Sequence, residues 1–271
     1  MTKTIFITGA SRGFGKIWAE AFLKRGDKVA ATARNTDSLK ELAKQYGDAL
    51  LPIQLDVTNR EACFAAINKA KEYFGRIDVV INNAGYGLMG AIEEASEQEA
   101  RDQIEANVFG LLWVTQAVLP VMRAQKNGHI IQLSSALGVA TLPVLGIYNA
   151  SKWAVEGLSE TLATEVKAFG INVTIVEPNG YATDFGSSAI RTQTIKAYDD
   201  VKAAFEADFT EDSYGIPEAT TEAILRLVDT VSPPLRLFLG KVALPWVKQV
   251  YEERLATWEE WKDVSAAAHG K

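Results

Sequence analysis

The sequence of 271 residues is poor in the side chains that build disulfides and soft-metal sites. It has one cysteine, Cys63, and two histidines, His129 and His269. A single cysteine excludes an internal disulfide, and so few soft ligands argue against a zinc site, so we expect no metal. A net charge of -6 without a basic stripe argues against nucleic acid as a partner. We find no apolar signal region and no apolar run of membrane-spanning length, and therefore expect a cytoplasmic protein without a membrane partner.

The sequence does have short apolar segments that alternate with amphipathic ones. Hydrophobic residues make up 48% of the chain, enough for one large core. The short segments are rich in Val, Ile and Leu and lack apolar/polar alternation, which is typical of strands buried on both faces. The pattern predicts an α/β fold, a doubly wound parallel sheet with helices on both faces, as a single domain over residues 1–271. We expect strands at 5–7, 28–33, 51–55, 79–82, 129–134, 172–176 and 235–239, and helices at 16–25, 36–46, 60–74, 97–122, 148–169 and 217–231.

Turn residues mark several of these boundaries. Gly75 and Gly170 follow two helical patterns and are expected helix stops, and Thr58 is a candidate N-cap. Two regions break the alternation. Residues 180–211 are mixed in composition and predict an irregular substrate loop or lid. Residues 242–262 carry aromatic and aliphatic residues at helical spacing, and we favour a helix packed on the core over an exposed partner-binding face.

A glycine-rich turn lies near the start of the chain. Residues Thr8 to Gly15 read TGASRGFG, directly after the first expected strand and directly before the first expected helix. A turn of this kind lets the backbone approach a pyrophosphate, and the helix N-terminus supplies free N–H groups and the positive end of a dipole. The first element is therefore expected to bind a nucleotide. Its spacing, Gly-x-x-x-Gly-x-Gly, differs from the usual dinucleotide fingerprint.

Two tyrosine–lysine pairs occur at one-turn spacing, Tyr148 with Lys152 and Tyr198 with Lys202. An ammonium near a phenol lowers the tyrosine pKa and makes the phenol a usable proton donor and acceptor. Only the first pair follows a strand that ends in hydroxyls, at Ser135, where ligands of open α/β sheets bind. We therefore assign the chemistry to Tyr148 and Lys152, and interpret the second pair as solvated neighbours.

Taken in order, these motifs resemble those of the short-chain dehydrogenase/reductase family, in its common branch of roughly 250 residues. The resemblance covers nearly the whole chain and implies a Rossmann-type fold and hydride transfer between a nicotinamide cofactor and a carbonyl/alcohol pair. The motifs that carry it are the glycine turn at 8–15, Leu55-Asp56-Val57, Asn82-Asn83-Ala84-Gly85, Asn107, Ser135, Tyr148 with Lys152, and Pro178.

The resemblance implies a catalytic role for four residues. Tyr148 would protonate the carbonyl oxygen during reduction, and Ser135 would hold that oxygen by a hydrogen bond. Lys152 would bind the nicotinamide ribose and lower the Tyr148 pKa. Asn107 would keep a water that links Lys152 to solvent.

The resemblance also implies the cofactor contacts. Asp56 would meet the adenine amino group, Asn83 would fix the strand edge near the adenosine, and Thr183 would bind the carboxamide. Where the family usually has Pro-Gly, this chain has Pro178-Asn179-Gly180. Asparagine best tolerates a positive φ among the other residues, so the turn can survive, and its amide could also reach the nicotinamide or the substrate; the choice between these two roles stays open. The full set of expected cofactor-binding residues is Gly9, Ser11, Arg12, Gly13, Phe14, Gly15, Arg34, Asp56, Val57, Asn83, Ala84, Gly85, Tyr148, Lys152, Pro178, Gly180 and Thr183.

The second expected strand indicates which nucleotide binds. An acidic residue at its end would bind the ribose 2′-OH, whereas an arginine there would accept a 2′-phosphate. Here that position is Ala33, Arg34 follows it, and Arg12 in the glycine turn adds a second guanidinium. We therefore expect NADP(H).

The substrate side is expected to be apolar and without a fixed charge, and to favour a hydrophobic ketone, aldehyde or alcohol. Two alternatives stay open: an NADP-binding regulatory protein without turnover, and an isomerase or epimerase of the same fold. By analogy with the family we expect a homo-oligomer, a dimer or a tetramer. The expected pocket residues are Leu137, Leu142, Val144, Tyr181 and Phe185.

Overall fold

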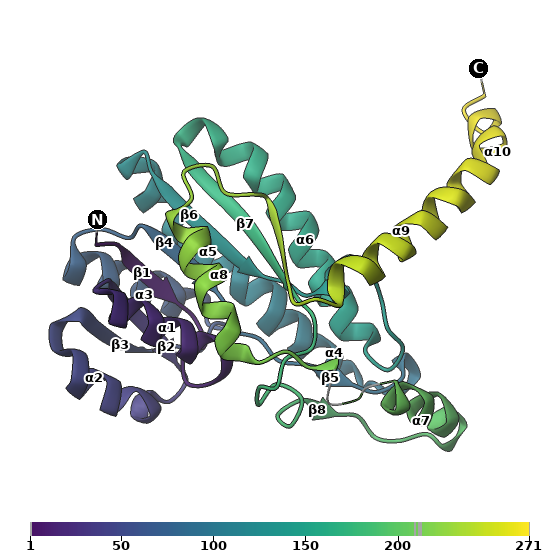
Figure 1. The fold of residues 1–271 in the computed structure, drawn as a ribbon, viewed down its shortest axis with the longest axis horizontal. Helices are drawn as coiled ribbons and strands as arrows, with labels where there is room; N and C mark the ends of the chain where they lie inside the picture. The colour runs from purple at the N-terminus through teal and green to yellow at the C-terminus, as the bar shows by residue number, and fades with distance from the viewer. Residues whose placement is uncertain (1, 209, 211–212, 271) are drawn as a thin grey trace.

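The computed structural model describes residues 2–208, 210 and 213–270. Its centre is a seven-stranded sheet with the order β3-β2-β1-β4-β6-β7-β9, in which every neighbouring pair is parallel. This confirms the predicted parallel sheet (Figure 1). The strands are β1 (Thr4–Ile7), β2 (Lys28–Ala33), β3 (Leu50–Gln54), β4 (Val79–Asn82), β6 (Gly128–Leu133), β7 (Ile171–Pro178) and β9 (Arg236–Leu239).

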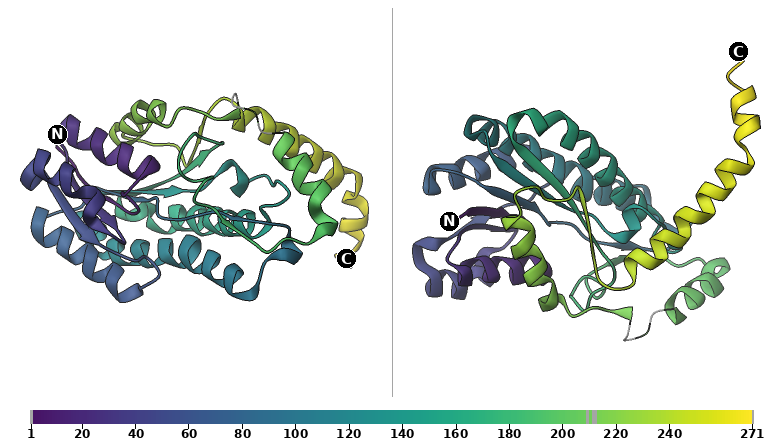
Figure 2. Two further views of the ribbon diagram at one scale, coloured as in Figure 1. Left: turned by 90° about the horizontal axis from the view of Figure 1, so that it is seen from below. Right: turned by 45° about the horizontal axis from the view of Figure 1, so that its top comes forward.

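Helices cover both faces of this sheet, as the alternating pattern predicts (Figure 2). One core cluster joins the sheet to α1, α2 and α8, around the fully buried Trp18 and Phe22. The other joins it to α3, α5 and α6, around Ile67, Val114 and Met122. The helices are α1 (Gly13–Arg25), α2 (Lys40–Tyr46), α3 (Arg60–Phe74), α4 (Glu97–Ile104), α5 (Gly110–Gln125), α6 (Gly146–Val166), α7 (Asp199–Ala207), α8 (Thr220–Asp229), α9 (Ala243–Glu260) and α10 (Lys262–Ala267).

Most element boundaries lie within a few residues of their predicted positions, and the caps explain them. Gly75 and Gly170 end helical segments in the left-handed conformation, which confirms both expected stops. The expectation for Thr58 is wrong, because the N-cap of α3 is Asn59, whose side chain accepts from the Ala62 N–H.

The helix predicted over residues 97–122 is continuous but not uniform. A π-helical segment, η4 (Glu105–Phe109), joins α4 to α5 and contains the buried Asn107. The combined helix Glu97–Gln125 is long and apolar enough to cross a membrane by length and composition, contrary to the sequence expectation that no segment would be. Core helices of soluble proteins pass the same test, and α5 packs against α3 and the sheet.

The segment 180–211, predicted to be irregular, contains regular structure. Strand β8 (Ile190–Arg191) pairs in parallel with β5 (Leu88–Met89), and α7 follows it. Two-residue strands carry no detectable period, so the sequence gives no sign of them.

The C-terminal helices do not pack on the core along their whole length, contrary to the favoured interpretation. At the base of α9, Ala243 is buried, and Val247 packs with Val139 and Ala140. Arg254 still donates to the Val139 carbonyl at 2.8 Å, and the outer part of α9 projects from the body of the molecule (Figures 1 and 2). Its outer apolar residues, Leu255, Trp258, Trp261 and Val264, are exposed.

Candidate active site

A cleft of about 1330 Å³ lies at the carboxyl ends of the central strands. The strand order reverses between β1 and β4, and open α/β sheets bind ligands at such a switch point. The cleft is larger than the usual space for one small ligand, so it has room for a dinucleotide together with a substrate. All four expected catalytic positions belong to elements around it, and Ser135, Tyr148 and Lys152 line it directly.

The glycine turn forms one wall of the cleft, and each glycine has its own role. A Cβ at Gly15 would lie 2.3 Å from the Gly9 carbonyl oxygen, and a Cβ at Gly9 would lie 2.9 Å from Ala84 Cα. These two glycines therefore allow close packing of α1 on the strand ends. Gly13, with φ 53°, would present a Cβ only to Thr183, 3.8 Å away. Its bare backbone leaves the first N–H groups of α1 open to the cleft, which fits a pyrophosphate.

Asn83 braces this turn. Its Nδ2 donates to the carbonyl oxygens of Thr8 and Gly9 at 2.8 and 3.0 Å. The backbone N–H groups of Asn83 and Ala84 both donate to Thr8 Oγ1 at 2.9 Å. This role of Thr8 could not be expected from the sequence, because a bond across 75 residues has no local signal.

The adenosine end of the cleft carries two arginines and no carboxylate at the end of β2. Arg12 and Arg34 both line the cleft and are exposed, and Ala33 is buried beside them. Neither arginine forms an ion pair within the described part of the chain. Asp56 also lines the cleft, and its carboxylate accepts from the Thr58 N–H and Oγ1 at 3.0 and 2.8 Å.

Ser135 and Tyr148 meet above the end of β6. The Ser135 Oγ accepts from the Leu137 N–H at 3.1 Å and donates to the Pro178 carbonyl at 3.5 Å. Tyr148, in the first turn of α6, is 6% exposed. Burial raises the pKa of its phenol, whereas a hydrogen bond with Ser135 lowers it. The pair thus holds a protonated phenol beside a hydroxyl.

Lys152 lies one turn further along α6. Its Nζ donates to the Leu133 carbonyl at 2.7 Å and lies 5.7 Å from the centre of the Tyr148 ring. Burial lowers the pKa of Lys152 to about 8, and the nearby Glu156 opposes this shift. Burial of the phenol and its hydrogen bond with Ser135 shift the Tyr148 pKa in this structure, and the expected lowering by Lys152 stays a prediction.

Asn107 is buried within the π-helical segment, where its amide bonds to the backbone of Tyr86. Its Oδ1 accepts from the Tyr86 N–H at 3.1 Å, and its Nδ2 donates to the Tyr86 carbonyl at 3.0 Å and to Ser151 Oγ at 3.1 Å. A Cβ at Gly85 would lie 2.9 Å from that Oδ1, so the glycine makes room for the amide. Asn107 thus ties the loop after β4 to α6, and its role toward a water and Lys152 stays a prediction.

The loop after β7 differs from expectation at Asn179. The residues other than glycine with positive φ in the described chain are Lys126 and Val144, so this turn requires no left-handed asparagine. The Asn179 Nδ2 donates to the Gly180 carbonyl at 2.7 Å instead of being free to reach a ligand. A Cβ at Gly240, in left-handed backbone, would lie 1.5 Å from the Asn179 Oδ1, so this glycine accommodates the larger side chain.

Except for Gly15, the remaining expected nucleotide contacts line the same cleft. Phe14 does so while stacking on Trp18, with ring centres 5.0 Å apart. Gly15 instead packs behind the turn, as described above. The others on the cleft wall are Ser11, Val57, Gly85, Pro178, Gly180 and Thr183.

The substrate end of the cleft is mainly apolar. Leu137, Leu142, Tyr181 and Phe185 line it as expected, and the Phe185 ring lies 5.5 Å from the Tyr148 ring. Val144 does not line it; its side chain borders a smaller neighbouring cavity. Among the apolar residues that line the cleft without having been expected to are Met89, Phe205 and Trp246.

The expectation of a substrate side without fixed charge is wrong. Arg191 and Glu206 line the cleft and also border the small cavity beside Met89 and Phe205, and Asp184 and Asp208 line the cleft as well. These residues come from the segment 180–211, whose folded position could not be inferred from composition.

Behind the catalytic residues lies a pair of buried carboxyl groups, Glu156 and Glu177. Burial raises the pKa of both, and that of Glu177 reaches about 8. Arg236 is shared between them, at 3.2 Å from Glu156 Oε2 and 3.4 Å from Glu177 Oε1. One arginine for two buried carboxyls favours a shared proton near neutral pH.

Comparisons with known proteins agree with this geometry. The short chain dehydrogenase family model matches residues 3–194. Oxidoreductase BOA17 of Botryotinia fuckeliana is 41% identical over 273 residues, which cover 99% of this chain and 100% of that protein. A crystal structure of a short-chain dehydrogenase from Streptomyces avermitilis is 38% identical, with a TM-score of 0.91 over 98% of each chain.

A further solved structure contains a nucleotide. It is an alcohol dehydrogenase from the archaeon Thermococcus sibiricus complexed with 5-hydroxy-NADP, 29% identical with a TM-score of 0.74 over 90% of this chain and 98% of that one. With the family motifs in one cleft and a family model matched over residues 3–194, this chain belongs to the short-chain dehydrogenase/reductase family of oxidoreductases.

Proposed function

We propose that this protein is an NADP(H)-dependent oxidoreductase that interconverts a hydrophobic ketone or aldehyde and the corresponding alcohol, a carbonyl reductase or alcohol dehydrogenase. The observation that carries the proposal is the hydrogen-bonded pair of Ser135 and Tyr148, which lines the same cleft as the glycine turn. A proton donor in reach of a nucleotide site is the minimum that carbonyl reduction requires.

The nicotinamide would supply and accept the hydride. The chain's own residues would manage the oxygen of the substrate. Ser135 Oγ would donate to that oxygen and orient it toward Tyr148, whose phenol would deliver the proton during reduction and take it back during oxidation. Lys152, with its pKa lowered to about 8, holds an exchangeable proton one turn away at neutral pH.

Arg12 and Arg34 support the choice of NADP(H). Both line the cleft without a carboxylate partner among the described residues, and β2 ends in Ala33. A 2′-phosphate would satisfy both guanidinium groups by charge-assisted hydrogen bonds, whereas a bare ribose would satisfy neither.

The test is a screen for NADPH oxidation against hydrophobic ketones and aldehydes of increasing chain length. We expect turnover that rises with apolar length, because Leu142, Phe185 and Trp246 offer apolar contact. Tight NADPH binding without any turnover would instead favour a regulatory protein, and conversion without net NADPH oxidation would favour an isomerase or epimerase.

We also propose that the protein is cytoplasmic and works as a homo-oligomer, either a dimer or a tetramer. The exposed apolar residues on the outer part of α9 and on α10 support association. Light scattering at micromolar concentration that showed only monomers would refute the oligomer.

A further inference from the structure

The second tyrosine–lysine pair lies in a cluster outside the catalytic site. Tyr198 and Lys202 do not interact with one another as a solvated pair. The Tyr198 hydroxyl donates to Glu93 Oε2 at 2.5 Å, and Lys202 Nζ lies 2.8 Å from Glu94 Oε1. The sequence interpretation of these residues as solvated neighbours is therefore wrong for Lys202, because the buried Glu94 approaches it from 108 positions away in the sequence, whereas the Tyr198 bond to Glu93 is exposed.

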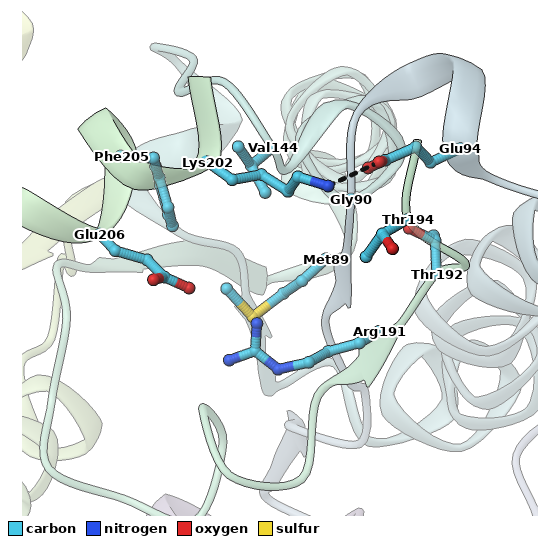
Figure 3. Close-up of a pocket in the computed structure, with 10 residues that line it drawn as sticks. All are labelled: Met89, Gly90, Glu94, Val144, Arg191, Thr192, Thr194, Lys202, Phe205 and Glu206. Atoms are coloured by element: carbon cyan, nitrogen blue, oxygen red, sulfur yellow. Dashed lines mark hydrogen bonds and ion pairs between the residues drawn. The ribbon is translucent and has the colours of Figure 1, made fainter. Parts of the chain in front are cut away.

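Glu94 is the centre of this cluster, and its side chain is 0% exposed. Its carboxylate accepts from the Ala91 N–H at 2.8 Å within its own segment and from the Ile195 N–H at 2.6 Å across the cluster. Lys202 supplies the compensating charge (Figure 3). A buried carboxylate is tolerated only with such partners, so separation of the two segments would leave it uncompensated or require its solvation.

The other charges around Lys202 belong to the segment that carries Glu94 or to α7 itself. Asp199 lies 3.4 Å from Lys202 Nζ, one turn earlier on α7. Hydrogen bonds from Ile195 and Lys202 hold the pKa of Glu94 at about 2. The ion pair is therefore complete throughout the pH range in which the protein would be assayed.

Helix α7 connects this ion pair to the substrate end of the cleft. Lys202 faces Glu94, whereas Phe205, one turn later, is buried with Leu137, Leu145 and Tyr148. Phe205 also lines the cleft. Any movement of α7 away from Glu94 would carry Phe205 away from the substrate.

The segment between β8 and α7 is also held in place by close packing. A Cβ at Gly90 would lie 1.9 Å from Thr192 Oγ1, so the segment after β8 rests directly on the Gly90 backbone. The Gly90 N–H donates to the Val144 carbonyl at 2.7 Å, and Val144 has a φ of 66°, unusual for a β-branched residue. Val144, Gly90 and Lys202 border one small cavity of about 60 Å³ (Figure 3).

We propose that the Glu94–Lys202 ion pair is a positioning element that holds α7 and Phe205 closed over the substrate end of the cleft. It sets how tightly the substrate is held, and leaves proton transfer at Tyr148 unaffected. The inference rests on the proposed reductase function for its kinetic readout, and on the geometry alone for its structural one.

The structural test is hydrogen exchange of the Ile195 amide, whose N–H donates to Glu94. It is measured on the free protein and requires no substrate. We expect Lys202→Met to raise the exchange rate of the segment 190–208 by at least about tenfold, since hydrogen bonds to charged groups are among the stronger ones in proteins. Lys202→Arg should restore protection, because it keeps the charge. Lys196→Met is the matched control: it removes an exposed lysine of the same segment that makes no ion pair within the described residues.

The kinetic test uses the best ketone from the NADPH screen. Lys202→Met should raise KM by about tenfold, with kcat unchanged or increased and NADPH affinity unchanged, because lids govern substrate retention and product release. Glu94→Gln should act in the same direction.

Unchanged exchange in Lys202→Met, or exchange raised equally by Lys196→Met, would overturn the inference. A loss of kcat at constant KM would also overturn it, because the pair would then act on chemistry. If no ketone is reduced at all, the proposed function is wrong. The exchange experiment still tests whether the ion pair holds α7 in place.

Discussion

The two tyrosine–lysine pairs of this chain share one spacing and lie in opposite surroundings. At the start of α6, Tyr148 and Lys152 are buried, and neither side chain has a carboxylate as a direct hydrogen-bond partner in the described chain. On α7 and just before it, Tyr198 and Lys202 each bond to a glutamate. The difference teaches that one-turn spacing specifies only a shared helix face, and that burial and partners distinguish the pair proposed for catalysis from the pair proposed to hold α7.

The pKa shifts of the two lysines run in opposite directions because their surroundings differ. Burial lowers the pKa of Lys152 to about 8, since few charges compensate it. A hydrogen bond to Glu94 raises the pKa of Lys202. A proton that can be exchanged near neutral pH is therefore found only at the first pair.

The largest expected effect separates the two tyrosines by activity. Tyr148→Phe removes only the phenolic proton and should lower kcat by about two to four orders of magnitude, with the fold and NADPH affinity kept. Steady-state kinetics with NADPH binding measured in parallel would check it. A mutant that keeps half of the wild-type kcat would show that Tyr148 is not the proton donor.

The next largest expected effect is on nucleotide preference, and it depends on the two arginines of the cleft. Arg12 and Arg34 have no carboxylate partner within the described residues, so a 2′-phosphate would be the first anionic group to pair with them. Two charge-assisted hydrogen bonds of roughly 1.5 kcal/mol each give about a hundredfold higher kcat/KM with NADPH than with NADH. Ala33→Asp combined with Arg34→Gln should reverse the preference, and Arg12→Ala should weaken NADPH alone. Equal KM values for the two nucleotides in the wild type would contradict this expectation.

A smaller effect separates the two lysines by the pH dependence of stability. Lys152 has a lower pKa folded than unfolded, so the unfolded state binds more protons between about pH 8 and 10.4, and this lysine makes stability rise with pH there. The gain is on the order of 2 kcal/mol. We expect Lys152→Met to lose this rise in denaturant unfolding at pH 8 and pH 10.

We expect Lys202 to affect the pH dependence of stability in the opposite direction. Its pKa is raised in the folded state, so its contribution is complete below its unfolded pKa and is lost as the pH rises through the folded value. The difference in unfolding free energy between wild type and Lys202→Met should therefore not grow between pH 8 and 10. A growing difference would remove the contrast between the two lysines.

The smallest expected effect is on the second tyrosine. Tyr198→Phe removes an exposed hydrogen bond to Glu93 and should change kcat and KM by less than about twofold, because surface interactions contribute little. Its assay alongside Tyr148→Phe is the direct comparison of the two pairs. A hundredfold loss of kcat in Tyr198→Phe would contradict both assignments.

The features that the sequence could predict are those with a local period or a local motif. Strand β2 (Lys28–Ala33) and strand β4 (Val79–Asn82) were expected with their observed bounds, since buried parallel strands are short apolar runs between turn residues. The glycine turn and the Tyr148–Lys152 pair could also be predicted from the sequence. Both are contiguous, and the strand that precedes each predicts which end of the sheet it occupies.

Other features depend on contacts between distant residues, and these the sequence could not predict. The π-helical segment around Asn107, the brace between Asn83 and Thr8, and the accommodation of Asn179 by Gly240 each join separate elements. The outer part of α9 has the helical apolar spacing of a core helix, yet it projects into solvent. Period alone shows which face is apolar, and it does not show what covers that face.

The sequence by itself determined the parallel α/β architecture, the nucleotide-binding turn and the family, because each depends on a short-range pattern that one stretch of chain carries. Only the tertiary structure decided which tyrosine–lysine pair is buried, which carboxylates surround Lys202, and which residues of the segment 180–208 line the cleft. The physical reason is that desolvation and ion pairing depend on the groups that folding brings within a few ångströms. At Lys202 the decisive group, Glu94, is 108 residues away in the chain and 2.8 Å away in space.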